Sequence, residues 1–151
     1  MANRTFYGSG DRPQSEPRVQ SGVVPYRVGP RGVEVLLVRT SRSRRWSIPK
    51  GNAEGHLTLA ANAAKEAFEE AGVTGEVAAQ PSGMYRAAKR AWHGEAIVEV
   101  WVYLLAVTGE SDDWPEKGRR QAKWMSHRAA AAALREPLLV SLCQELGRTK
   151  R

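Results

Sequence analysis

The stretch GNAEGHLTLAANAAKEAFEEAGV, residues 51–73, decides the fold because it encodes a helix with a defined beginning and end. Thr58 can serve as the N-cap, since its hydroxyl can accept a hydrogen bond from an amide of the first helical turn. Alanine, the best intrinsic helix former, dominates the residues that follow. Gly72 stands where a helix commonly ends in a left-handed cap. The stretch therefore predicts a helix between Thr58 and Gly72.

Three carboxylates of this helix project within one narrow sector. Glu66, Glu69 and Glu70 are related by i+3 and i+4 spacings, at which like charges repel by roughly a few tenths of a kcal/mol per pair. A hard divalent cation explains the cluster, because Mg²⁺ prefers carboxylate oxygens and bridges protein acids to substrate phosphates. A solvated acidic face, with Lys65 and Glu69 as an i,i+4 ion pair, is the alternative.

The wider spacing resembles the Nudix box, G-x5-E-x7-R-E-U-x-E-E-x-G-U, in which U is an aliphatic residue. Two positions depart from that pattern. Leu57 stands in place of its first Glu, and Lys65 replaces its Arg, keeping the charge but losing the planar guanidinium fork. The matching positions are Gly51, Glu66, Glu69, Glu70, Gly72 and Val73, with Ala67 as a small substitute for the first aliphatic residue.

This resemblance implies an α/β fold, the Nudix α/β/α sandwich with a mixed sheet, a loop-helix-loop box and a C-terminal helix. It also implies hydrolysis of a pyrophosphate with Mg²⁺ or Mn²⁺. Glu69 and Glu70 match the paired metal ligands, and Glu66 matches a metal ligand or base. Lys65 matches the residue that orients a Glu, and the Gly51 carbonyl is a further ligand. Candidates to replace the carboxylate missing at Leu57 are Glu54, Glu95, Glu99 and Glu116.

Local patterns outside the box predict further strands and helices. Residues 20–28 and 33–39 read as a hairpin around a Gly-Pro-Arg-Gly turn, residues 96–108 as a strand buried on both faces, and residues 87–94 as a basic turn. Trp46 and Ile48 suggest a short buried strand. Ser126 can cap a last helix that is interrupted at Pro137 and resumes over residues 138–146. The box alanines are expected to face the sheet, with the glutamates opposite.

The length of 151 residues predicts a single domain over residues 18–147, with a flexible tail at 1–17 and a basic tail at 148–151. No apolar run reaches the roughly 18–20 residues of a membrane span, and the first residues lack the apolar segment of a signal peptide. Cys143 is the single cysteine, which favours a reducing compartment, and we expect a cytoplasmic protein.

The charge balance favours a polyanionic partner, because the formal net charge is +7 and the isoelectric point is near 10.0. Basic runs flank the box, as in the diphosphoinositol polyphosphate and diadenosine polyphosphate phosphohydrolases that the chain resembles. We therefore expect a polyphosphorylated small molecule as substrate. The cations expected to bind it are Arg42, Arg44, Arg45, Lys50, Arg86, Lys89 and Arg90.

Three other functions remain open at this point. The substitutions at Leu57 and Lys65 are compatible with a non-catalytic Nudix-fold module that binds a nucleotide. The basic charge is compatible with a nucleic-acid-binding protein, although no nucleic-acid-binding motif appears. An RNA 5′-end pyrophosphohydrolase combines the two ideas.

Overall fold

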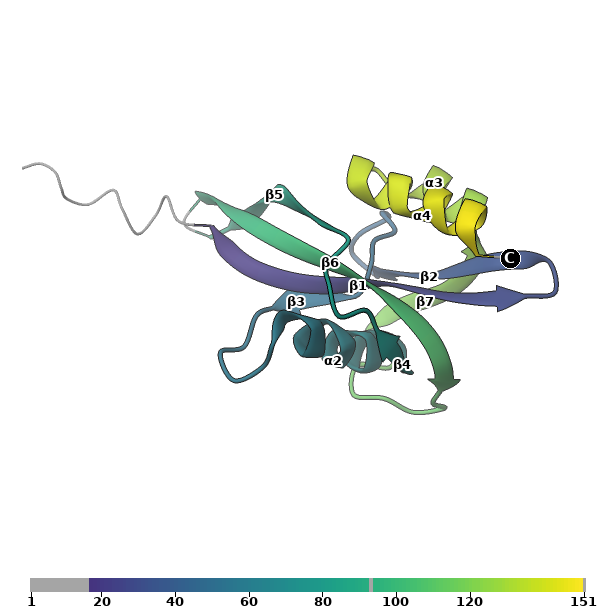
Figure 1. Cartoon of the computed structure of the whole chain (residues 1–151). Helices are drawn as coiled ribbons and strands as arrows, with labels where there is room; N and C mark the ends of the chain where they lie inside the picture. Colours follow the sequence, from purple (N-terminus) through teal and green to yellow (C-terminus); the bar gives the residue numbers. More distant parts are fainter. Residues whose placement is uncertain (1–16, 93, 151) are drawn as a thin grey trace, which may run out of the picture.

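A computed structural model describes residues 17–92 and 94–150, and within them the chain forms one seven-stranded sheet with helices on both faces (Figure 1). The tail predicted for residues 1–17 lies, apart from Pro17, outside the described residues. The elements are β1 (Arg18–Gly29), β2 (Gly32–Thr40), β3 (Lys50–Asn52), α2 (Leu59–Ala71), β4 (Val73–Val77), β5 (Gly83–Ala91), β6 (Gly94–Glu110), β7 (Arg120–Ser126), α3 (His127–Ala133) and α4 (Pro137–Thr149).

The sheet is mixed, as predicted. Its strands follow the order β4-β6-β1-β2-β7, with β3 paired to β1 and β5 paired to β6. The β1–β6 pair is parallel, whereas the other pairs are antiparallel. The predicted hairpin is confirmed, because Tyr26 pairs with Val35 and Gly29 with Gly32 around the turn.

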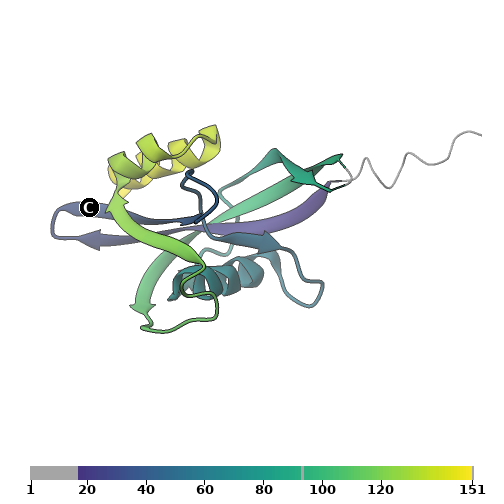
Figure 2. The ribbon, with the colours of Figure 1, turned by 180° about the vertical axis from the view of Figure 1, so that it is seen from behind.

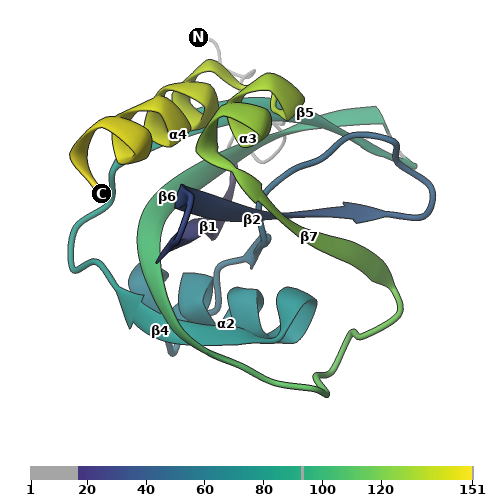
Figure 3. The same cartoon turned by 90° about the vertical axis from the view of Figure 1, so that its right-hand side faces the viewer.

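The helices cover the two faces of the sheet and enclose two cores (Figure 3). Val98, Val100 and Val102 of β6 pack on the face covered by α3 and α4. Tyr103 and Leu105 of the same strand pack on the face covered by α2. Alternate residues of an extended strand point to opposite faces, so a central strand between two helical layers is apolar at most positions. The prediction of a strand buried on both faces is confirmed.

The C-terminal helices begin where local signals place them. The Ser126 hydroxyl accepts a hydrogen bond from the Ala129 amide at 3.1 Å, which caps α3. Pro137 occupies the first turn of α4, where its missing N–H has no intrahelical partner to lose. The helix α4 continues to Thr149 and so includes residues 148 and 149 of the predicted basic tail, where Arg148 pairs with Glu145. No helix in the described part of the chain is long and apolar enough to cross a bilayer.

Two predictions about loops need correction. Residues 83–91 form strand β5, although residues 87–94 were expected to turn, because Ala87 pairs with Val98 and Lys89 with Ala96 on β6. Tertiary pairing commonly overrides weak strand propensity in this way. His93 of that predicted turn lies outside the described residues. The loop of residues 41–49 between β2 and β3, which we call the basic loop, contains the residues expected to form a short strand. Its Ile48 is buried, but only Ser47 makes an isolated bridge, to Val38, so no strand forms there.

Candidate functional site

The helix α2 begins and ends as its sequence predicts. The Thr58 hydroxyl accepts a hydrogen bond from the Ala61 amide at 3.1 Å. Gly72 has a φ of 72°, and its amide donates to the Phe68 carbonyl at 2.9 Å, which gives a left-handed C-cap. Buried Asn62 donates to the Ser21 hydroxyl at 2.9 Å and so ties α2 to β1. These contacts fix the rotation of the helix and hence the direction of its carboxylates.

The glutamates do not all lie opposite the alanines, so that prediction is wrong for Glu66 and Glu70. Both are buried, with exposed fractions of 8% and 5%, next to the buried alanines Ala63 and Ala67. At about 100° per residue, Glu70 lies about 20° and Glu66 about 60° from Ala63 around the helix, both on the side away from Ala67. Glu69 lies further round and is partly exposed.

Strand β3 brings the first glycine of the box against Glu66. Gly51 pairs with Ser21 of β1, and a Cβ atom built on Gly51 would collide with the Glu66 carboxyl group. A glycine is therefore required for this close approach. The Gly51 backbone and the Glu66 carboxylate lie side by side, which is the arrangement that a shared cation needs.

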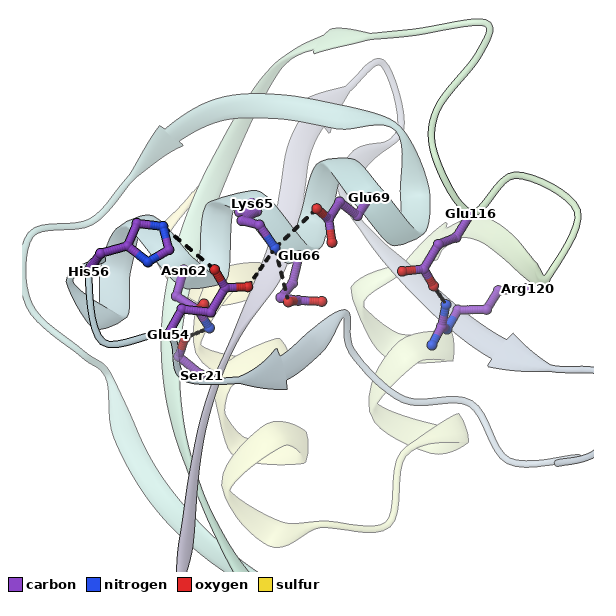
Figure 4. A network of polar contacts seen from close by, with 9 residues as sticks. All are labelled: Ser21, Glu54, His56, Asn62, Lys65, Glu66, Glu69, Glu116 and Arg120. Atoms are coloured by element: carbon purple, nitrogen blue, oxygen red, sulfur yellow. Dashed lines mark hydrogen bonds and ion pairs between the residues drawn. The ribbon is translucent and has the colours of Figure 1, made fainter.

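Lys65 lies among three carboxylates (Figure 4). Its Nζ is 3.0 Å from Glu54, 3.0 Å from Glu69 and 3.9 Å from Glu66. Hydrogen bonds to Glu54 and then Glu69 raise the pKa of Lys65 above its usual value. Glu54 comes from the loop between β3 and α2, so it supplies a carboxylate partner that Leu57 cannot. His56 also approaches Glu54, at 3.7 Å, and is mostly exposed.

A second polar group forms around Glu70. Arg120, the first residue of β7, approaches Glu70 at 3.6 Å and also pairs with Glu116. The loop of residues 111–119 between β6 and β7 runs past α2 (Figure 2), where the Glu116 amide donates to the Glu69 carbonyl at 3.0 Å. Sequence reasoning missed Arg120, because no local pattern indicates that the start of β7 lies beside Glu70.

The electrostatics of these groups reflect their burial. Burial raises the pKa of Glu70 to about 8, and the nearby Arg120 opposes that shift. Burial likewise raises the pKa of Glu66. Burial lowers the pKa of Lys50, with the Glu70 carboxylate acting in the opposite direction. A raised pKa means that burial destabilises the charged form of each carboxylate. A cation bound nearby would stabilise that charged form.

The donor set suits a hard divalent cation, because it combines buried carboxylates with a backbone cradle at Gly51 that a Cβ would fill. As they stand, no three acidic, histidine or cysteine side chains of residues 17–92 and 94–150 converge to hold a metal ion. The Lys65 ammonium lies among the carboxylates instead. Binding of a metal would therefore require Lys65 and the glutamates to adjust, and Glu66, Glu69, Glu70 and Gly51 stay predicted ligands.

Three cavities adjoin this carboxylate site. The largest, about 610 Å³, lies between the basic loop, β5 and the α3–α4 connection, and we call it the ring cavity. Its wall includes the predicted cations Arg45, Lys50 and Lys89. A second cavity of about 520 Å³, the arginine cavity, includes the predicted Arg44. A third, of about 190 Å³, contains Glu70 and Arg120 and is called the junction cavity.

Three predicted substrate-binding cations do not line these cavities. Arg42 is exposed on the basic loop. Arg86 makes a 2.9 Å ion pair with Glu99, across β5 and β6. Arg90 pairs in register with Glu95 on the same hairpin, and strand alternation places it on the side of Arg86 rather than that of Lys89. Their role in binding substrate stays a prediction that the cavities do not support.

The chain is similar to known proteins over most of its length. A family model described as NUDIX domain matches residues 16–141. Nudix hydrolase 12, mitochondrial, from Arabidopsis thaliana, is 32% identical over 130 residues, which cover 75% of this chain and 64% of that protein. Diphosphoinositol polyphosphate phosphohydrolase 3-beta from Bos taurus is 32% identical over 119 residues, covering 75% and 68%.

A solved structure of a C. elegans Ap4A hydrolase binary complex shares the fold, with a TM-score of 0.60 at 22% identity over 85% of this chain and 93% of that chain. The chain spans less than two thirds of the length of the plant relative. The box geometry, the sandwich of helices around a mixed sheet and the family match agree with one another. This chain belongs to the Nudix family.

Proposed function

We propose that this chain hydrolyses a phosphoanhydride bond in a polyphosphorylated small molecule with the help of Mg²⁺ or Mn²⁺. The observation that carries the proposal is the buried pair of Glu66, which lies against Gly51, and Glu70, which lines a cavity together with cations. Nudix enzymes typically depend on divalent metals. A module that had lost catalysis would have no reason to keep two carboxylates buried at this cost.

The residues have distinct roles in this proposal. Glu66, Glu69, Glu70 and the Gly51 carbonyl would hold the metal, which when bound polarises phosphoryl oxygens and lowers the pKa of water. Lys65 orients Glu69 through its 3.0 Å ion pair and is itself held by Glu54. Glu54 is thus a positioning residue that compensates for Leu57.

The substrate phosphates meet cations from two elements. Lys50 and Arg120 line both the ring cavity and the junction cavity, so both cations reach the space beside Glu70. Arginine and lysine form charge-assisted hydrogen bonds to phosphate oxygens, and arginine can do so with two parallel bonds. These side chains are suited to hold a phosphate group next to the carboxylates while its negative charge increases.

We propose a diphosphoinositol polyphosphate or a diadenosine polyphosphate as substrate. The name of the bovine relative supports the first, and that of the C. elegans Ap4A hydrolase supports the second. The cavities support them as well, because cations line all three. A clear preference for ADP-ribose or deoxynucleoside triphosphates would contradict this choice.

The test is phosphate release by the purified chain on a panel of these compounds and a 5′-triphosphate RNA, with Mg²⁺, with Mn²⁺ and with a chelator. We expect metal-dependent release that falls by at least about a hundredfold in Glu66→Gln, because a metal ligand and a charge are lost. Glu76→Gln, at an exposed position of β4, removes the same charge and should keep the wild-type rate. Metal-independent release, or a Glu66→Gln variant as fast as wild type, would refute the proposal.

We also propose the cytoplasm as the compartment. The single cysteine, Cys143, is buried and unpaired, which suits a reducing environment. Two relatives, Nudix hydrolase 12 and Nudix hydrolase 21, are named as mitochondrial and chloroplastic proteins, so these organelles are the alternatives. Cell fractionation followed by immunoblotting decides between them.

A further inference from the structure

None of the described residues that line the arginine cavity carries a carboxylate. This cavity is formed by the end of β2, the basic loop, the last residues before β7 and the start of β7. Four arginines line about 520 Å³, and the wall residues are Arg39, Thr40, Ser41, Ser43, Arg44, Gly118, Arg119, Arg120 and Gln121. Like charges that converge on one hollow are costly unless an anion compensates them.

The four arginines fall into two kinds. Arg39 is fixed, because its Nε donates to Gln121 at 3.0 Å and its guanidinium lies 4.5 Å from the centre of the Trp46 ring. Arg120 is fixed by Glu116 and Glu70. Arg44 and Arg119 are exposed and have no carboxylate partner among residues 17–92 and 94–150. Two arginines that are fixed by other residues, next to two that have no carboxylate partner among the described residues, are suited to bind several phosphate oxygens.

The junction cavity connects this site to the carboxylates. It contains Glu70 and shares Arg39 and Thr40 with the arginine cavity. It shares Arg45 and Lys50 with the ring cavity. The junction cavity therefore adjoins both other cavities, and the ring cavity and the arginine cavity also share Ser43 and Arg120.

The ring cavity differs in chemistry from the arginine cavity. Besides its cations it presents Trp46, Tyr85 and the apolar side chains Val98, Leu134 and Leu139. The aromatic and aliphatic part of this wall suits a planar ring. Burial raises the pKa of Tyr85 to about 12, so its phenol stays neutral there.

We infer that the arginine cavity is a second anion site, which holds the phosphates beyond the reacting bond of a nucleoside polyphosphate whose base lies in the ring cavity. The inference rests on the proposed function and narrows its substrate. It requires a substrate with a planar base on one side of Glu70 and more than two phosphates in all. An inositol polyphosphate has no planar ring for the ring cavity, and ADP-ribose has no phosphate left for the arginine cavity.

The test compares Arg44→Gln/Arg119→Gln with a matched control, Arg31→Gln/Arg128→Gln. Both double variants remove two positive charges from exposed positions, but Arg31 lies in the β1–β2 turn and Arg128 in α3. The measured quantity is the ratio of kcat/KM for adenosine 5′-tetraphosphate to that for ADP-ribose. We expect the ratio to fall at least about tenfold in the test variant, since each charge-assisted contact is worth about that factor. The control should keep the wild-type ratio.

Binding of inorganic tripolyphosphate to the metal-free protein provides a readout that does not need turnover. Its Kd should rise about tenfold or more in the test variant and stay unchanged in the control. An unchanged Kd or an unchanged ratio in the test variant would overturn the inference, as would faster turnover of a diphosphoinositol phosphate than of any nucleotide. If wild type hydrolyses none of the compounds, the proposed function fails, whereas tripolyphosphate binding still decides whether the anion site exists.

Discussion

Glu70→Gln should stabilise the metal-free protein. Glu70 is buried, and burial raises its pKa from 4.5 to about 8. The folded state therefore binds the proton more tightly than the unfolded state, so stability falls as the pH rises from about 4.5 towards about 8. At about pH 7 the buried carboxyl costs on the order of 3 kcal/mol relative to a neutral side chain, since one pKa unit corresponds to about 1.4 kcal/mol.

Glutamine removes this cost without changing the shape of the side chain, and Arg120 keeps Glu116 as a partner. Thermal unfolding in a chelator at about pH 7 should show a melting temperature higher by roughly 6–12 °C. At about pH 5 the gain should shrink to under about 1 kcal/mol, because Glu70 is then protonated in the folded protein. Glu76→Gln, at an exposed position, should change stability by less than about 0.5 kcal/mol.

Bound metal should reverse the order of stability of the wild type and the Glu70→Gln variant. A cation bound at the carboxylates compensates the charge of Glu70, so Mg²⁺ should stabilise wild type more than the variant, and more strongly towards alkaline pH. A Glu70→Gln variant that melts at or below the wild-type temperature in chelator would refute this reasoning. A wild-type stability that does not fall between about pH 5 and about pH 8 would refute it equally.

The remaining predictions concern the box glycines and the cysteine. Gly51→Ala should lower kcat/KM by at least about a hundredfold, because its Cβ would displace the Glu66 carboxylate, while Gly55→Ala, which has open space around it, should not. Gly72→Ala should lower the free energy of unfolding in urea by about 1–2 kcal/mol or more, since alanine must hold a φ of 72°; an unchanged midpoint would contradict this. Burial raises the pKa of Cys143 to about 11, so a thiol reagent should label it only after denaturation, and prompt labelling of the native protein would contradict its burial.

Several features of the fold follow from short stretches of sequence. Thr58 and Gly72 bound the box helix, Ser126 caps α3, and the Gly-Pro-Arg-Gly turn forms the first hairpin. Each of these features depends on contacts between residues within about four positions of one another, so it can be read from the local sequence. The resemblance to the Nudix box gives Gly51 and Glu66 as ligands, whereas their close approach is a finding of the structure.

The side of the sheet on which each basic side chain of β5 lies could not be predicted from local sequence. Lys89 borders the ring cavity whereas Arg86 pairs with Glu99, because both belong to a strand whose register is set by β6. Residues 87–94 carry no strong strand signal of their own. Unless these residues are known to form a strand, alternate residues cannot be assigned to opposite faces of the sheet. The sequence therefore does not distinguish the cations that reach a cavity from those that do not.

The sequence by itself determined the box helix, its three glutamates and their spacing, since helical geometry is fixed by neighbours along the chain. Only the tertiary structure decided that Glu70 is buried and that Arg120 reaches it from β7. It also decided that Lys65 takes Glu54 as a partner where Leu57 offers none. The physical reason is that these contacts join distant segments, and their distances depend on how the helices and strands pack rather than on any local spacing.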